Sequence, residues 1–256
     1  MSSRCEGCKP FSRSWSAVPG MDVYWLEQTS ADLPAGDDWL SVNEAIRQHG
    51  MRFPKRRADW RLGRWTAKRL VAVHLSLPAD PRSLARIEIR AAPGGAPEVV
   101  LGSEPAPVVI SISHRGGRAV CAIAGPQAAL GCDLEIAEPR SQAFATDYFT
   151  AAEQELLAQA SLADRWQLLA LLWSGKESVL KALRVGLRLD TRCVAIDPFL
   201  GQVSDGSDWR PLCAHHDGQV LSGWWRQTGG PVRTMVRTMV AVPAPAAPRA
   251  FGRDRL

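Results

Sequence analysis

The chain has 256 residues, of which 46% are hydrophobic and 22% are charged. This balance excludes a disordered or collagen-like chain and predicts a folded globular protein large enough for one or two domains. The 31 Lys and Arg residues outnumber the 26 Asp and Glu residues, which gives a formal net charge of +5 that suits an anionic partner without identifying it.

Cysteine usage and the N-terminus bear on the compartment. Six cysteines are too sparse for a disulfide scaffold, and no apolar run approaches the length of a membrane span. Residues 1–20 contain no apolar stretch of the kind that directs export, and the first patterned segment begins at Met21. We therefore expect a reduced, cytoplasmic protein without a membrane span, and a disordered extension over residues 1–20.

The first third of the chain has a strand pattern at residues 23–26 and an amphipathic helix pattern at residues 38–48. Residues 52–69 then carry eight basic side chains against one acid, with apolar residues at helical spacing. A solvated helix face usually intersperses acids with bases, so a solvated face and an anion-binding helix are both open interpretations of this run.

The middle of the chain is rich in strand patterns. Residues 91–107 are rich in Gly and Pro and are predicted to form a loop. Alternating and β-branched residues then predict three successive strands, at residues 108–113, 118–124 and 130–136. In the last of these, Asp133 and Glu135 share a face, because successive side chains of a strand alternate. They would repel each other without a cation such as Mg²⁺ between them, although a solvated edge strand also explains them.

The second half opens with T-A-A-E at residues 150–153, a capping box that predicts the start of a helix. A longer helix is predicted over residues 164–183, where Trp173, Glu177 and Lys181 lie four residues apart on one stripe. An ordinary i,i+4 ion pair beside a core tryptophan would also explain this stripe. Strand patterns follow as far as residue 242.

Helix and strand patterns in both halves predict an α+β, sandwich-like protein with two packed lobes. We place the N-terminal lobe at residues 21–126 and the C-terminal lobe at residues 127–242. The Pro, Ala and Arg composition of residues 243–256 predicts a disordered tail.

Five short motifs follow one another in the order found in one enzyme family. Residues 131–135 read G-C-D-L-E and residues 173–181 read W-S-G-K-E-S-V-L-K, which resembles the two-part signature of the 4′-phosphopantetheinyl transferases. The segments 111–114 (S-I-S-H), 149–153 (F-T-A-A-E) and 181–187 (K-A-L-R-V-G-L) resemble three further family motifs. By length the chain is similar to the larger, surfactin-synthetase-activating type, in which two similar lobes form a pseudo-dimer around the site.

The resemblance implies that the phosphopantetheine arm of coenzyme A is moved to a serine of an acyl or peptidyl carrier protein, which leaves 3′,5′-ADP. It implies Mg²⁺, with Mn²⁺ as the alternative, held by Asp133, Glu135 and Glu177 against the pyrophosphate. Glu177 would also be the base that takes the serine proton. Lys181 would contact coenzyme A and neutralise the departing phosphate.

The resemblance also assigns groups that bind coenzyme A. Ser113 and His114 end the S-I-S-H strand and are expected to contact its phosphates. The turn at residues 94–97 lacks the lysine that many family members carry there, so one phosphate contact is either missing or supplied by another residue.

The basic run fits the same substrate. Residues 55–64 resemble the family's R-R-x-E-F-x-x-x-R segment, which places Arg56 and Arg64 at the nucleotide end of coenzyme A. A guanidinium binds phosphate well because it can donate two parallel hydrogen bonds. Further candidates are Lys55, Arg57 and Lys176.

Two other functions are open on the residues alone. A nucleic-acid-binding protein would use the basic run beside Trp60 and Trp65, but it would leave the three carboxylates Asp133, Glu135 and Glu177 unexplained. A Mg²⁺-dependent phosphohydrolase of a nucleotide-like substrate would use the same carboxylates with water as the nucleophile. The motif order favours the transferase, so we expect carrier proteins of fatty acid, polyketide or nonribosomal peptide synthesis as partners and no nucleic acid.

Overall fold

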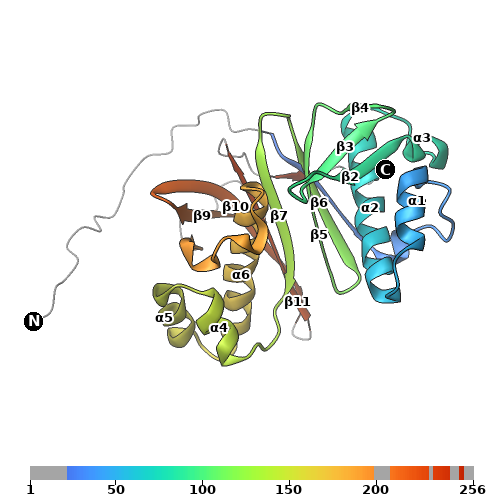
Figure 1. Cartoon of the computed structure of the whole chain (residues 1–256). Helices are drawn as coiled ribbons and strands as arrows, with labels where there is room; N and C mark the ends of the chain where they lie inside the picture. The colour runs from blue at the N-terminus through green and yellow to red at the C-terminus, as the bar shows by residue number, and fades with distance from the viewer. Residues whose placement is uncertain (1–21, 199–207, 231–232, 243–247, 251–256) are drawn as a thin grey trace, which may run out of the picture.

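A computed structural model describes residues 22–198, 208–230, 233–242 and 248–250 of the chain. The described residues form two main β-sheets that lie side by side, each with one long helix, and we call these two parts the first and the second lobe (Figure 1). The α+β class predicted from the sequence is confirmed. The disordered extension predicted over residues 1–20 lies outside the described residues.

The first lobe is built on a four-stranded sheet and one long helix. In order across the sheet, its strands are β12 (Arg249–Ala250), β1 (Tyr24–Thr29), β6 (Arg118–Ala124) and β5 (Val109–Arg115). Its helices are α1 (Val42–His49), α2 (Pro54–His74) and α3 (Pro81–Ala85), with the short η1 (Ser30–Asp32) after β1. The core of the lobe forms where α2 buries Leu70 and Val71 with Ile123 of β6.

A small hairpin sheet lies where the sequence predicted a loop. Its strands are β2 (Ile87–Ala91), β3 (Pro97–Leu101) and β4 (Glu104–Pro105). The loop predicted over residues 91–107 is therefore wrong: its glycines belong to tight turns, and Gly95 has a φ of +88°. Val99 and Val100 are both buried, so the strand between the turns lacks the polar alternation by which we recognised the other strands.

The second lobe has a five-stranded sheet covered by the other long helix. In order across the sheet, its strands are β7 (Ala129–Ile136), β11 (Arg233–Val242), β10 (Gln219–Gly230), β9 (Arg210–His216) and β8 (Val194–Asp197). Its helices are α4 (Gln142–Tyr148), α5 (Ala151–Gln159) and α6 (Arg165–Ala182), followed by η2 (Gly186–Arg188) and η3 (Thr191–Cys193). Leu172 and Val179 of α6 pack into the core beneath this sheet.

The two lobes meet along β5 and β7, which are edge strands of their respective sheets. Side chains of β5 bridge to β7: the backbone amide of Cys132 donates to Ser111 Oγ over 2.9 Å, and Ser113 Oγ donates to Asp133 over 2.7 Å. The boundary that we predicted after residue 126 falls in the connection between β6 and β7.

The end of the described chain returns to the first lobe. Arg249 and Ala250 pair in parallel with Tyr24 and Trp25 of β1. The disordered tail predicted from residue 243 is therefore wrong for these two residues, because β1 offers an edge with which they pair. Residues 243–247 and 251–256 lie outside the described residues.

Both lobes begin a helix with the same capping box. Ser41 caps α1 and accepts from the amide of Glu44, whose carboxylate accepts from the amide of Ser41. Thr150 and Glu153 make the same reciprocal bonds at α5, as their sequence predicted. Both glutamates are buried, with exposures of 3% and 2%.

The long helices carry similar sequences that meet these glutamates. Residues 65–68 of α2 read W-T-A-K, and residues 173–176 of α6 read W-S-G-K. The fully buried ammonium of Lys68 pairs with Glu44, and that of Lys176 pairs with Glu153. In each lobe a strand amide also donates to the glutamate, from Ile89 in the first lobe (3.1 Å) and from Ile196 in the second (2.9 Å). Each lobe therefore has a buried Lys–Glu pair that ties a helix start, a long helix and a strand together.

Candidate active site

The strand β7 and the helix α6 bring two predicted site residues together. Lys181 Nζ donates to Asp133 Oδ1 over 2.6 Å and to the carbonyl oxygen of Cys132 over 3.1 Å. Ser113 of β5 donates to the same Oδ1 atom, and Asp133 is only 5% exposed. Three elements from the two lobes therefore converge on a single buried carboxylate.

Gly131 explains why α6 lies so close to β7. A Cβ atom at this position would lie 1.8 Å from the carbonyl oxygen of Ser178 and 2.7 Å from the amide nitrogen of Ala182. Both of these atoms belong to the backbone of α6, so only glycine permits this approach. The first glycine of the G-C-D-L-E motif thus sets the distance between Asp133 on the strand and Lys181 on the helix.

Glu177 lies one helical turn before Lys181 and shares its electrostatic environment. Burial raises the pKa of Glu177; the Lys181 charge opposes this shift and the Asp133 charge adds to it. Burial by itself would lower the pKa of Lys181, but its neighbours, chiefly Asp133, outweigh burial and raise the pKa. The three groups therefore act on one another as charges, with Lys181 held in its protonated form.

Glu135 lies two residues further along β7 and faces two arginines. Arg115 and Arg140 each approach its Oε2 atom within 3.5 Å, and both also pair with Glu138. Burial raises the pKa of Glu135, the Asp133 charge adds to this rise and the two arginines oppose it. The Asp133 charge thus acts on both other carboxylates that were predicted to bind the metal.

The carboxylate oxygens fit a divalent cation by their chemistry rather than by a preformed geometry. Within the described ranges, no group of three or more His, Cys, Asp or Glu side chains is arranged as a ready metal site. However, Asp133 Oδ2 is a buried oxygen with no hydrogen-bond partner, and its carboxylate raises the pKa of both Glu135 and Glu177. An all-oxygen donor set with one unpartnered buried oxygen fits Mg²⁺ chemically, although its three members are not preassembled.

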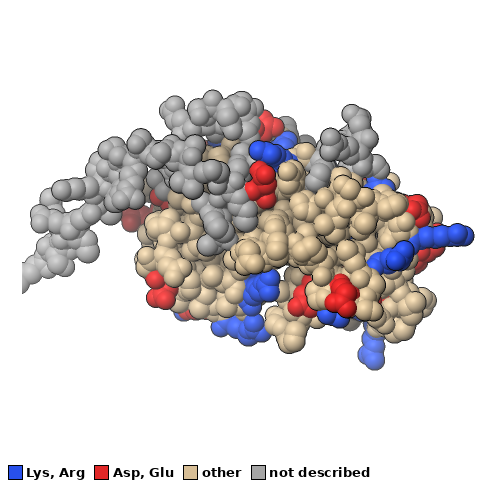
Figure 2. Space-filling model, turned by 90° about the horizontal axis from the view of Figure 1, so that it is seen from above, with Lys and Arg blue, Asp and Glu red and all other residues tan. Residues whose placement is uncertain are grey.

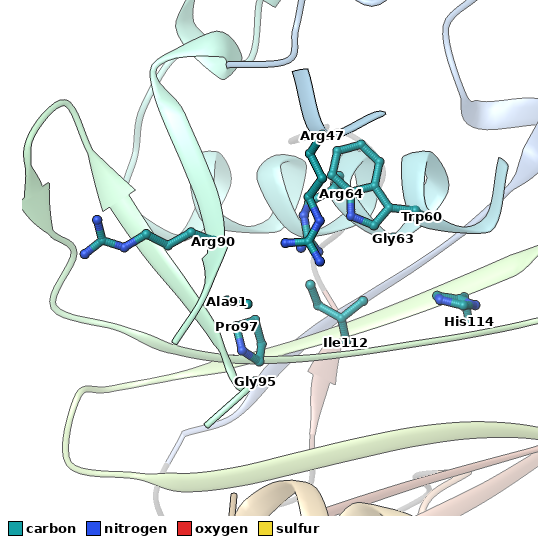
Figure 3. A pocket seen from close by; sticks show the side chains of 10 residues that line it. All are labelled: Arg47, Trp60, Gly63, Arg64, Arg90, Ala91, Gly95, Pro97, Ile112 and His114. Atoms are coloured by element: carbon teal, nitrogen blue, oxygen red, sulfur yellow. The ribbon is translucent and has the colours of Figure 1, made fainter. Parts of the chain in front are cut away.

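A pocket of about 210 Å³ opens in the first lobe between α1, α2, the β2–β3 hairpin and β5. The residues lining it include Arg47, Trp60, Arg64, Arg90, Ile112 and His114 (Figure 3). The guanidinium groups of Arg47 and Arg64 point into the same space above Ile112, whereas that of Arg90 points away from them (Figure 3). Arg90 pairs instead with Glu98 at 3.4 Å.

Arg64 is the most enclosed cation of this pocket. Its side chain is 12% exposed, its guanidinium lies over the Trp60 ring with a centroid distance of 5.1 Å, and its Nε lies 3.9 Å from Glu44. Burial lowers the pKa of Arg64 to about 10; the Glu44 charge opposes this shift and the Arg47 charge adds to it. Two like charges that converge on one cavity favour an anionic ligand.

His114 connects the pocket with the carboxylates, because it follows Ser113 on β5. The ring is exposed towards the pocket, yet desolvation by the surrounding protein lowers the pKa of His114. The pocket and the Asp133 carboxylate are therefore served by neighbouring residues of the same strand.

Several predicted ligands lie away from this pocket. Arg56 is exposed and does not line it, the ammonium of Lys55 pairs with Asp59 at 3.4 Å, and Arg57 donates to the carbonyl oxygen of Met51 over 2.6 Å. Lys176 is fully buried in its pair with Glu153, so we assign it a structural role. Ser113 reaches Asp133 rather than the pocket.

The pocket also contains an arginine that the sequence analysis missed. Arg47 lies one turn after Glu44 on α1, within the helix predicted at residues 38–48, and nothing in that amphipathic pattern separates a pocket arginine from a solvated one. The same applies to Arg90, because residues 91–107 were predicted to be a loop and the strand before them was not recognised.

The basic run of α2 does not form a continuous cationic face. Lys68 is fully buried and Arg64 largely so, and both turn towards Glu44. On the face shown in Figure 2, basic and acidic side chains are scattered in small groups.

Among the described residues no helix is both long and apolar enough to cross a membrane.

Residues 129–233 match the family model described as the 4′-phosphopantetheinyl transferase superfamily. The chain is 25% identical over 224 residues to the L-aminoadipate-semialdehyde dehydrogenase-phosphopantetheinyl transferase of Mus musculus, which covers 81% of this chain and 71% of the relative. A holo-[acyl-carrier-protein] synthase of Thermotoga maritima is 19% identical, with a TM-score of 0.31, over 46% of this chain and 63% of that chain. The matched region contains Asp133, Glu135, Glu177 and Lys181. Residues 129–233 thus match a 4′-phosphopantetheinyl transferase superfamily domain, and the chain is similar over most of its length to a phosphopantetheinyl transferase.

Proposed function

We propose that the chain moves the 4′-phosphopantetheine arm of coenzyme A to a serine of a carrier protein in a Mg²⁺-dependent reaction. The observation that carries this proposal is the adjacency of two sites along β5. Ser113 reaches the buried Asp133 carboxylate, and the next residue, His114, lines the pocket in which two arginines converge. A substrate with a nucleotide at one end and a pyrophosphate in its middle suits both sites at once.

In this proposal the pocket binds the nucleotide end of coenzyme A. Arg64 and Arg47 would hold its phosphates through charge-assisted hydrogen bonds, and His114 would bind on the side nearest the carboxylates. Arg47 would supply the phosphate contact that the turn at residues 94–97 lacks. Arg56 is exposed outside the pocket, so its effect would be confined to long-range attraction.

The carboxylates Asp133, Glu135 and Glu177 would hold the Mg²⁺. When bound, the cation would neutralise charge on the pyrophosphate. Ser113 supports this arrangement by donating a hydrogen bond to Asp133 Oδ1. Asp133 Oδ2 has no hydrogen-bond partner and would be the atom that binds the metal. Ser113 is thus a positioning residue for Asp133 in this proposal.

Glu177 would take the proton from the hydroxyl group of the carrier serine, because its raised pKa makes it a better base than an ordinary glutamate. The serine oxygen would form a bond to the phosphorus next to the pantetheine arm. The bond from that phosphorus to the bridging oxygen would break, and 3′,5′-ADP would leave with the electron pair. Lys181, protonated and one turn from Glu177, would neutralise the charge that develops on the departing phosphate.

The similar construction of the two lobes, together with the different site residues that each supplies, supports a pseudo-dimer in one chain. Each lobe has a long helix whose W-T-A-K or W-S-G-K segment buries a lysine against a capping-box glutamate. In this arrangement α2 supplies the pocket arginine and α6 supplies Glu177 and Lys181. The proposed site lies between the lobes, where β5 and β7 meet.

The partners and the compartment belong to the same proposal. Acyl and peptidyl carrier proteins are commonly acidic, so the excess of basic residues would assist their encounter with the enzyme. The free thiols among the described residues, Cys121, Cys132, Cys193 and Cys213, suit a reducing cytoplasm.

The proposal is tested by incubating the protein with coenzyme A, Mg²⁺ and a panel of apo carrier proteins, and measuring their intact masses. At least one carrier should gain the mass of one phosphopantetheine arm, and a carrier whose acceptor serine is replaced by alanine should gain nothing. Release of nucleotide with every carrier unchanged would indicate the phosphohydrolase instead.

A further inference from the structure

The buried Lys–Glu pair of the first lobe contains a cation that its counterpart in the second lobe lacks. Four residues before Lys68, α2 carries Arg64, whose Nε lies 3.9 Å from Glu44 Oε1. Four residues before Lys176, α6 carries the fully buried Leu172 instead. The Glu44 carboxylate therefore faces two cations of α2, whereas Glu153 faces one cation of α6.

The position of the Arg64 guanidinium is fixed by its surroundings. One face of it lies over Trp60, and its Nε edge lies beside Glu44. That Nε atom is buried without a hydrogen-bond partner, so its contact with Glu44 is ionic. The terminal nitrogen atoms point into the pocket together with those of Arg47 (Figure 3).

We propose that Glu44 is a positioning residue for the coenzyme A pocket, which holds Arg64 with its terminal amino groups towards the substrate phosphates. This inference rests on the proposed function, because it assigns the pocket to coenzyme A. Without the Glu44 carboxylate, the buried charges of Lys68 and Arg64 would repel each other, and the charge of the exposed Arg47 would add to the repulsion on Arg64. The Arg64 side chain would then leave the position in which it binds phosphate.

The test compares the two lobes in matched variants. Glu44→Gln with Lys68→Met removes one negative and one positive buried charge, so the net charge of the pocket region does not change. Glu153→Gln with Lys176→Met makes the same change in the second lobe, where no arginine depends on the carboxylate. Removing both partners avoids an unpaired buried charge, which is what destabilises single variants of such pairs.

Calorimetry with coenzyme A should separate the two variants. The Kd should rise about tenfold in the first-lobe variant and stay within about twofold in the second-lobe variant, because only the first removes the group that orients a phosphate-binding arginine. In steady-state assays of the first-lobe variant, the KM for coenzyme A should rise while kcat stays within about twofold. This split is expected when a variant weakens binding of the ground state and of the transition state by the same amount.

Two further variants connect the effect to Arg64. Arg64→Leu reproduces the residue found at the matching position of α6, and in that background the Glu44→Gln and Lys68→Met changes should not weaken coenzyme A binding further. If the first-lobe pair variant does not fold, Glu44→Asp retains the charge but withdraws it from Arg64, and should still raise the Kd.

The outcomes are distinct. A folded first-lobe variant with the wild-type Kd, or equal losses of affinity in the two lobes, would overturn the role of Glu44. A wild-type Kd in folded Glu44→Asp, or a further tenfold loss of affinity in the Arg64→Leu background, would also contradict it. Failure of the wild-type protein to bind coenzyme A would instead reject the proposed function.

Discussion

Replacing Gly131 by alanine tests whether the close approach of α6 to β7 builds the site. The new Cβ atom would lie 1.8 Å from the carbonyl oxygen of Ser178 and 2.7 Å from the amide nitrogen of Ala182. Ordinary contact would require β7 and α6 to separate by about 1.5 Å or more. Since both atoms belong to the helix backbone, no side-chain rotation can relieve the clash.

The displacement has consequences for stability and for catalysis. Overpacking a core costs about 1–3 kcal/mol, and we expect the upper end because the clash involves backbone. A loss of about 3 kcal/mol corresponds to a fall in Tm of about 6–12 °C for a chain of this size. The 2.6 Å contact of Lys181 with Asp133 spans the same two elements, so transfer activity should fall with it.

A matched control lies on the same helix. The three atoms nearest to a Cβ atom at Gly175 would all belong to the side chain of Ile196, at 3.1–3.2 Å, and α2 already carries Ala67 at the matching position. Gly175→Ala should leave Tm and activity nearly unchanged, because the helix preference for alanine over glycine, about 1 kcal/mol, offsets the small shift that the Ile196 side chain must make. Thermal unfolding and carrier modification assays compare the two variants. If Gly131→Ala melts with the wild type and keeps its full rate, the close packing does not determine the site.

Three further predictions concern the chemistry of the site. Glu177→Gln should lower kcat at least about 10²-fold with little change in Tm, and a full rate would exclude Glu177 as the base. In calorimetry, Arg64→Ala should weaken coenzyme A binding by about 1.5–3 kcal/mol, and a loss as large in the exposed Arg56→Ala would contradict the assignment of the pocket. Burial, with the added Asp133 charge, raises the pKa of Glu177 and Glu135, so the folded state retains their protons to higher pH than the unfolded state. Stability should therefore fall as pH rises from the ordinary carboxyl pKa through the raised values, and Mg²⁺ should restore Tm above that range in the wild type but not in Asp133→Asn. Identical Tm profiles with and without Mg²⁺ would argue against metal binding by these carboxylates.

Much of the carboxylate site could be predicted from the sequence because its determinants are local. A strand of period two places Asp133 and Glu135 on one face, and a helix places Glu177 one turn before Lys181. The contact of Lys181 with Asp133 depends on the packing of α6 against β7, which the motif suggests only through Gly131. In the sequence this glycine is only one position of a family motif. The structure shows that a side chain at this position would clash with the backbone of α6.

The arginine-lined pocket was harder to predict because its walls come from separate elements. Arg64 was expected to bind the nucleotide and does line the pocket, whereas Arg56 looks equivalent in sequence but lies outside it. Arg47 comes from a different helix, and sequence periodicity gives no information on which basic side chains of two helices meet. Tertiary packing decides which arginines face the cavity.

The buried lysines show a second limit of sequence analysis. Lys68 lies in a run of basic residues and Lys176 in a segment that resembles a family motif, yet both pair with capping-box glutamates. The two long helices carry the similar segments W-T-A-K and W-S-G-K. This similarity indicates a shared structural role only once both lysines are known to be buried. Lysine side chains are rarely fully buried, so the sequence pattern alone did not lead us to expect a buried lysine with a charged partner.

The central claim is that one site binds coenzyme A and passes its arm to a protein. It is tested most directly by measuring, in one reaction with Mg²⁺ and an apo carrier protein, the 3′,5′-ADP released and the carrier modified. We predict that the wild-type protein forms the two products in equal amounts throughout the reaction. The Glu177→Gln variant should form both products much more slowly than the wild type. Nucleotide release that exceeds carrier modification from the outset, or that proceeds equally without any carrier, would contradict the transfer.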